Sequence, residues 1–274
     1  MVIDSHQHFW KYDPVRDSWI TDEMAVIQRD FLPDDLAPEL KSNGVDGCVS
    51  VQADQSETET EFLLHLADEA PIVQGVVGWV DLRSDDLTDR LQYFKKFPKL
   101  KGFRHVVQGE PKGFLNNPKF VNGVNELAKR GFTYDLLIYH HQIPEALEFV
   151  AKVPETKIVI DHIAKPAIAR GEKTQWELNM QAMATFPNIF CKLSGMVTEA
   201  SWQNWKRDDF YPYLDEVMEA FGPKRLMYGS DWPVCLVAAS YAEQFDIVRS
   251  YISRLSAAEQ KAILGGNAIA FYGL

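Results

Sequence analysis

The 274 residues of the chain are 46% hydrophobic and 24% charged, a composition that supports a packed core and excludes intrinsic disorder. The 28 Lys and Arg residues are outnumbered by 39 Asp and Glu residues, and the net charge of −11 argues against a protein that binds duplex nucleic acid. No segment approaches the roughly 20 continuous apolar residues of a membrane span, and residues 1–20 do not resemble a signal peptide.

Short apolar runs alternate with longer stretches of helical periodicity along the whole chain. Several of the runs are rich in Val, Ile, Phe or Tyr, as strands buried on both faces should be. Eight such runs are predicted to be strands, and they cover residues 2–6, 46–52, 73–79, 100–105, 132–137, 157–162, 189–194 and 225–231.

The segments between these runs carry the signals of helix starts. Asn117 and Pro118 give a cap followed by proline at the first helical position. Three other segments begin with a serine that is followed three residues later by a glutamate, which is the pattern of a capping box: Ser56 and Glu59, Ser240 and Glu243, and Ser256 and Glu259. We therefore expect helices to alternate with the strands.

Eightfold alternation of strand and helix predicts a (β/α)8 TIM barrel that forms a single domain over residues 1–274. An open, doubly wound sheet would favour a glycine-rich phosphate loop after an early strand, but the first run ends in Asp4-Ser5-His6-Gln7-His8. No repeat or linker interrupts the chain. The three cysteines are odd in number and far apart, which indicates reduced thiols and a cytoplasmic protein.

Polar side chains fall at the ends of several predicted strands, where the active site of a barrel is built. His6 and His8 are two residues apart, so their imidazoles point to the same side of the strand. Two converging imidazoles suit a metal ion or a polarised carbonyl, although an isolated His-x-His is more often a pair of loop histidines. Three further runs end in Arg104-His105, Asp161-His162 and Asp231. Each alone could be a helix cap or a buried ion pair, but their coincidence at strand ends predicts one site.

Four motifs carry a resemblance to a known family: His6-x-His8, Asp161-His162 with Lys165-Pro166, Lys192-Leu193-Ser194-Gly195, and Gly229-Ser230-Asp231-Trp232-Pro233. They are similar to motifs of the amidohydrolase superfamily, and more narrowly of its sugar-lactonase branch, which includes L-fuconolactonase and L-rhamnonolactonase-like proteins. The similarity extends to the closing residues 267–274. It implies a barrel enzyme that opens a sugar lactone, such as L-fucono- or L-rhamnono-lactone, to the sugar acid.

The resemblance also implies roles for the residues at the strand ends. Asp231 would activate water, while His6, His8 and His162 would polarise the carbonyl with or without one divalent ion, zinc or manganese. Arg104 would supply a fixed positive charge near the oxyanion. Members with two metals carry a lysine or glutamate on strand four and histidines on strands five and six. Because this chain departs from that pattern, its four matching residues can hold at most one metal: His6, His8, His162 and Asp231.

A sugar lactone also requires groups that bind hydroxyls and a flat apolar wall. The candidates at or just after strand ends are Gln52, Trp79, His105, Gln108, Asp135 and Trp232. Trp79 could equally belong to the core, and Asp135 could orient another residue. Lys192 is expected to face either the substrate or an internal ion pair. His140-His141 could cap the next helix or line the mouth of the barrel.

Three other functions fit the same scaffold. A metal-dependent decarboxylase is disfavoured because no histidine follows His162, and amide hydrolysis is disfavoured because the ligands for two metals are missing. A catalytically inactive barrel that binds a sugar acid is disfavoured because Asp231 is present beside three histidines. The sequence leaves the sugar, the ring size, the metal requirement and the oligomeric state open.

Overall fold

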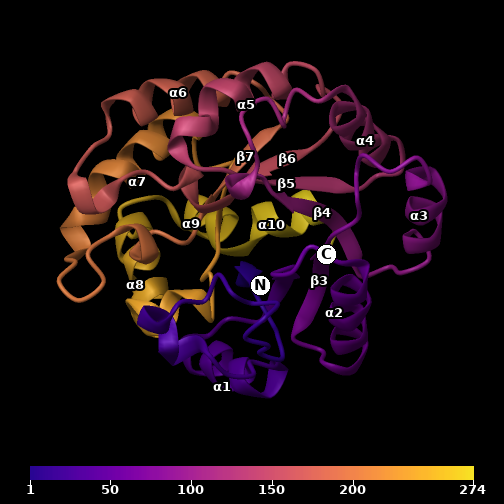
Figure 1. Ribbon diagram of the computed structural model, residues 1–274. Coiled ribbons are helices and arrows are strands. Elements are labelled where there is room, and N and C mark those ends of the chain that lie inside the picture. The colour runs from indigo at the N-terminus through magenta and orange to yellow at the C-terminus, as the bar shows by residue number, and fades with distance from the viewer.

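The computed structural model describes residues 1–274 and confirms the predicted (β/α)8 barrel. Eight parallel strands are hydrogen-bonded in chain order: β1 (Ile3–Gln7), β2 (Gly47–Val51), β3 (Val73–Gly78), β4 (Leu100–Val106), β5 (Thr133–Leu137), β6 (Ile158–Ile160), β7 (Ile189–Leu193) and β8 (Leu226–Tyr228). The helices are α1 (Pro33–Asn43), α2 (Glu57–Glu69), α3 (Leu87–Phe94), α4 (Pro118–Lys129), α5 (Ile143–Val150), α6 (Thr174–Ala184), α7 (Arg207–Phe221), α8 (Tyr241–Ile252), α9 (Ala257–Lys261) and α10 (Asn267–Tyr272). Helices α1–α8 surround the strands in Figure 1. None of the helices is long and apolar enough to cross a membrane.

The barrel closes between β1 and the segment that follows β8. The backbone N–H of His8 donates to the carbonyl of Trp232 at 2.7 Å, and the N–H of Asp231 donates to the carbonyl of His6 at 2.8 Å. Gln7 and Trp232 form a parallel bridge at the same point. Closure therefore places the first and last candidate residues of the sequence on neighbouring chain segments.

Strands β6 and β8 end two and three residues earlier than the sequence predicts, so the predicted ends at residues 162 and 231 are wrong. β6 stops at Ile160 and β8 at Tyr228. The backbone of His162 (φ 53°) and of Asp231 (φ 59°) is left-handed, which a strand cannot accommodate. The chain turns sharply at both candidate residues.

The predicted helix caps form, with one difference. Ser240 and Ser256 make complete capping boxes, and the Asn117 side chain accepts the N–H of the second helical residue. The Ser56 hydroxyl accepts the N–H of Glu59, but the Glu59 carboxylate does not return to Ser56. It accepts two backbone N–H groups of the loop after β2 instead, at 3.0 and 2.7 Å, and so holds that loop at the mouth of the barrel.

The barrel interior has an apolar layer that α10 covers. Six side chains from five strands form this layer with three residues of the helix: Ile3, Val49, Val51, Val77, Val159, Met227, Ala268, Phe271 and Tyr272. In Figure 1, α10 lies within the ring of outer helices. A separate and larger cluster fills the space around the strands. The polar candidate residues therefore lie toward the opposite end of the barrel, away from α10.

Buried charges lie next to this apolar layer. Lys192 is 0% exposed and donates to the carboxylate of Asp135, which also accepts the Tyr272 hydroxyl at 2.8 Å. Burial raises the pKa of Asp135 to about 6, although Lys192 opposes the shift. A charge in such surroundings is tolerated because it is paired and hydrogen-bonded. Tyr272 thus connects α10 to the charged interior.

The hydrogen bond of Tyr272 gives a test of this connection. Tyr272→Phe removes one donor from a buried carboxylate and should lower the free energy of unfolding by about 1–3 kcal/mol. Urea denaturation followed by circular dichroism measures the change. Tyr211→Phe, on the outer helix α7, is the control and should have little effect; equal losses in the two variants would contradict the prediction.

Candidate active site

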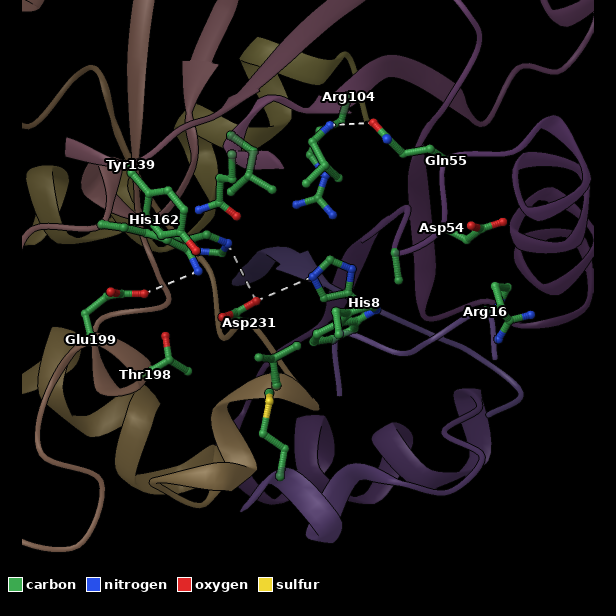
Figure 2. A pocket seen from close by; sticks show the side chains of 18 of the residues that line it. His8, Arg16, Asp54, Gln55, Arg104, Tyr139, His162, Thr198, Glu199 and Asp231 are labelled. Atoms are coloured by element: carbon green, nitrogen blue, oxygen red, sulfur yellow. Dashed lines mark hydrogen bonds and ion pairs between the residues drawn. The ribbon is translucent and has the colours of Figure 1, made fainter. Parts of the chain in front are cut away.

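The carboxyl ends of the strands surround a cavity of about 580 Å³. Five residues of the predicted set line it: His8, Arg104, Gln108, His162 and Asp231. Asp231 lies between His8 and His162 in Figure 2, and Arg104 projects from another side. His6 is fully buried and does not line the cavity.

The ring nitrogens of three histidines converge on one carboxylate oxygen. Asp231 Oδ1 lies 3.4 Å from His8 Nε2, 3.7 Å from His162 Nε2 and 3.8 Å from His6 Nε2. The Nε2 atoms of His6 and His8 are 3.1 Å apart. Residues from both ends of the chain therefore meet at one point, as the proposed site requires.

Local structure fixes the direction of Asp231. The buried carboxylate of Asp4 accepts the backbone N–H of Ser230 at 2.8 Å and that of His6 at 3.1 Å, which ties β1 to the end of β8. Burial raises the pKa of Asp4 to about 6. Gly229 permits the close approach, because a Cβ at this position would lie only 2.7 Å from the Cβ of His6.

Burial governs the protonation of the histidines. It lowers the pKa of His8, and it lowers the pKa of His6 and of His162 well below the ordinary value, so all three rings are neutral at neutral pH. Burial alone would raise the pKa of Asp231, but its electrostatic interaction with His162 and its hydrogen bond with His8 outweigh burial and leave this pKa lowered. Asp231 is therefore a carboxylate among neutral imidazoles.

A buried ion network holds His6 from inside the barrel. The Nδ1 atom of His6 lies 3.1 Å from Lys192 Nζ and 3.2 Å from Asp161 Oδ1. The same Asp161 oxygen is 3.0 Å from Lys192 Nζ, and Oδ2 accepts an N–H of Arg104 at 3.2 Å. Burial would raise the pKa of Asp161, but Lys192, His6 and Arg104 hold it well below its ordinary value. Of its two predicted orientations, Lys192 adopts the internal ion pair.

The donor atoms at the convergence point fit one divalent metal ion. Tetrahedral zinc with bonds of about 2.0–2.1 Å places neighbouring ligand atoms about 3.4 Å apart. The atoms His6 Nε2, His8 Nε2 and Asp231 Oδ1 are 3.1, 3.4 and 3.8 Å apart. The other nitrogens face away: Nδ1 of His8 lies 2.7 Å from the carbonyl of Val51, and Nδ1 of His162 lies 2.9 Å from the Ser194 hydroxyl. Such outward contacts orient metal-binding histidines.

A second group of donors is already satisfied by the protein. His6, Asp161 and His162 also have ligand atoms close together. The Asp161 carboxylate, however, is paired with the ammonium of Lys192 and the guanidinium of Arg104, which supply the positive charge that a second ion would bring. Asp161 is therefore already paired with cations of the protein.

The other residues predicted to bind substrate do not line the cavity: Gln52, Trp79, His105, Asp135 and Trp232. Successive strand residues point to opposite sides, so Arg104 faces the cavity while His105 stacks on Phe114 of the outer layer. Gln52 donates to the carbonyl of Arg104 at 3.2 Å. Trp79 donates to Nδ1 of His105 at 3.3 Å, and Trp232 packs against aromatic side chains. These residues support the wall of the site rather than forming its surface.

Loops after the strands supply most of the cavity surface. The sequence did not predict the following lining residues as part of the site: Arg16, Trp19, Met24, Ala53, Asp54, Gln55, Val106, Leu137, Tyr139, Lys165, Thr198, Glu199, Trp202 and Val234. The indoles of Trp19 and Trp202 offer the flat wall, and Lys165 pairs with Glu199 at 3.3 Å. One feature of the sequence could have indicated some of these lining residues: the segment between β1 and α1, residues 8–32, is long, and long loops at this end of a barrel are commonly functional.

Comparison with known proteins agrees with the motifs. A family model described as amidohydrolase matches residues 3–274. An L-fucono-1,5-lactonase of Burkholderia multivorans is 41% identical over 99% of this chain and 96% of its own length. An L-fucono-1,5-lactonase of Burkholderia ambifaria is 34% identical over 98% of this chain and 94% of its own. A crystal structure of an amidohydrolase from Burkholderia multivorans with bound zinc has a TM-score of 0.97 and 41% identity, and the match covers 100% of this chain and 99% of that one.

Gly195 gives a test of how His162 is placed. A Cβ at Gly195, which has a φ of +59°, would lie 2.4 Å from His162 Nδ1, whereas a Cβ at Gly171 (φ +66°) would meet nothing within 4 Å. Both alanine variants carry the cost of a left-handed alanine, but only Gly195→Ala also clashes with the imidazole. We expect Gly195→Ala to lower the free energy of unfolding by about 1–3 kcal/mol more than Gly171→Ala does. Urea denaturation of the two variants measures the difference, and equal stabilities would contradict the prediction.

Proposed function

The chain belongs to the amidohydrolase family, and we propose that it hydrolyses a sugar-derived lactone, an aldonolactone such as L-fucono- or L-rhamnono-lactone, to the open-chain sugar acid. The observation that carries the proposal is the convergence of three imidazoles on the Asp231 carboxylate, which lines the cavity together with His8 and His162. The names of the two similar lactonases support a 1,5-lactone as the first substrate to test.

Asp231 serves as the base and then as the acid. Its lowered pKa keeps it ionised at neutral pH, ready to accept a proton from the attacking water. The water oxygen bonds to the lactone carbonyl carbon, and the carbonyl oxygen becomes an oxyanion. When the bond to the ring oxygen breaks, Asp231 returns its proton to that oxygen. The products are a free hydroxyl and a carboxylic acid, which ionises and releases one proton to the solution.

Positive groups near Asp231 stabilise the oxyanion. Arg104 lines the cavity, its Nη1 atom lies 3.4 Å from His6 Nε2, and its guanidinium supplies a positive charge. A single zinc or manganese ion, held by His6, His8, His162 and Asp231, would act as a Lewis acid toward the carbonyl oxygen when bound. Loop residues of the cavity, including Lys165 and Glu199, offer charged and polar groups to the sugar hydroxyls.

Turnover of a lactone panel tests the proposed function. We expect proton release above the spontaneous rate, followed with a pH indicator, for at least one of L-fucono-, L-rhamnono-, D-galactono- and D-arabinono-lactone. The panel is run as purified, after chelation, and with added zinc or manganese, which also measures the metal requirement. Failure on all four under every condition rejects the proposal. Release of carbon dioxide from an unsaturated acid would favour a decarboxylase, and sugar-acid binding without turnover would favour an inactive barrel.

Replacement of the base tests the role of Asp231. Asp231→Asn keeps the shape of the side chain and removes the proton acceptor, so we expect the kcat to fall by about 10²–10⁴-fold. Asp85→Asn removes a carboxylate that is 92% exposed and should leave the kcat unchanged. Full activity in Asp231→Asn would remove this residue from the mechanism.

A further inference from the structure

The turn that follows β6 has an uncommon backbone. His162, Ile163, Ala164 and Lys165 have φ values of 53°, 47°, 58° and 47°, so four consecutive residues are left-handed. None of them is a glycine, and a side chain disfavours this conformation at every position. Such residues normally occur singly. One hydrogen bond closes the turn internally, from the N–H of Lys165 to the carbonyl of His162 at 2.8 Å.

The turn determines where two cavity side chains point. His162 begins it, and its Nε2 lies 3.7 Å from Asp231 Oδ1. Lys165 ends it, and its ammonium lies 3.3 Å from Glu199 at the cavity surface. A relaxation of the backbone to right-handed values would redirect both side chains. The surroundings must therefore hold the turn in place.

Two side chains from other elements hold the backbone of the turn. The indole of Trp176, on α6, donates its N–H to the carbonyl of Ile163 at 2.8 Å. The Nδ1 atom of His140, which follows β5, lies 2.8 Å from the carbonyl oxygen of Lys165. Trp176 is 2% exposed and His140 is half-buried, and neither lines the cavity. The two contacts hold the second and fourth residues of the turn, one from each neighbouring side of β6.

We propose that Trp176 and His140 are positioning residues for His162. By donating N–H groups to the carbonyls of the left-handed turn, they hold the backbone that aims the imidazole at Asp231. The contact of His162 with Ser194 orients the ring, but it does not hold the main chain behind the ring. The inference rests on the proposed catalytic role of His162.

Four variants test the contacts. Trp176→Phe and His140→Ala each remove one N–H donor, and we expect the kcat on the active lactone to fall by about 10–100-fold, as displacement of a catalytic group by about 1 Å does. The KM should change less than about twofold, because neither residue touches the cavity. His140→Asn returns a donor close to the position of Nδ1 and should restore most of the kcat. Trp205→Phe is the matched control, because it removes an indole N–H that donates at 2.8 Å to the carbonyl of Ala238, whose φ of −135° is not left-handed.

A spectroscopic readout separates this inference from the proposed function. In protein labelled with ¹⁵N-histidine, the imidazole signals of His162 should shift in Trp176→Phe and His140→Ala and stay in place in Trp205→Phe. This measurement needs no substrate, so it shows whether Trp176 and His140 position His162 even if no lactone in the panel is hydrolysed. The proposal is overturned if these signals do not move, or if Trp205→Phe loses as much kcat as Trp176→Phe. If Trp176→Phe does not fold, the comparison of His140→Ala with His140→Asn still tests the proposal. Equal kcat values in these two variants would overturn the proposal.

Discussion

The ammonium group of Lys192, enclosed inside the barrel, is the interaction on which the site depends. It lies between the carboxylates of Asp135 and Asp161 and contacts the inner nitrogen of His6. Without this cation, two like charges would remain close together without exposure to solvent, and at least one would have to take up a proton. The orientation of His6 would change with them, because Asp161 is its other neighbour. His6, one of the three neutral imidazoles around Asp231, is thus held by charged side chains that do not line the cavity.

The barrel and most of the residues around Asp231 could be predicted because short stretches of the sequence indicate them. A strand buried on both faces is an apolar run, and a parallel barrel brings the ends of such runs to one rim. His8, Arg104, His162 and Asp231 are found there for that reason. The position of a residue at a strand end does not predict whether its side chain faces the cavity or the outer helices. His105 follows Arg104 and faces Phe120 on the outer helix α4, because successive strand residues point to opposite sides; its position at a strand end does not reveal this.

Other parts of the site depend on contacts that no sequence pattern encodes. The left-handed turn after β6 starts where the apolar run predicts that the strand continues. Two side chains from other segments contact the backbone of the turn: His140, which precedes it in the chain, and Trp176, which follows it. The cavity surface likewise comes from loops whose path depends on packing over the whole rim. Gln55, for example, reaches the site while its side chain accepts the backbone N–H of Val106 at the end of β4.

The way the barrel closes has a consequence for its biosynthesis. His6 lies on the first strand to leave the ribosome and His8 directly after it, whereas Asp231 follows the last strand. Until β8 arrives, β1 has a neighbour on one side only and remains an open edge of an unfinished sheet. A nascent or truncated chain that lacks β8 and the segment after it therefore carries the imidazoles without Asp231. The point at which the three imidazoles meet Asp231 forms only when these two edges of the sheet join.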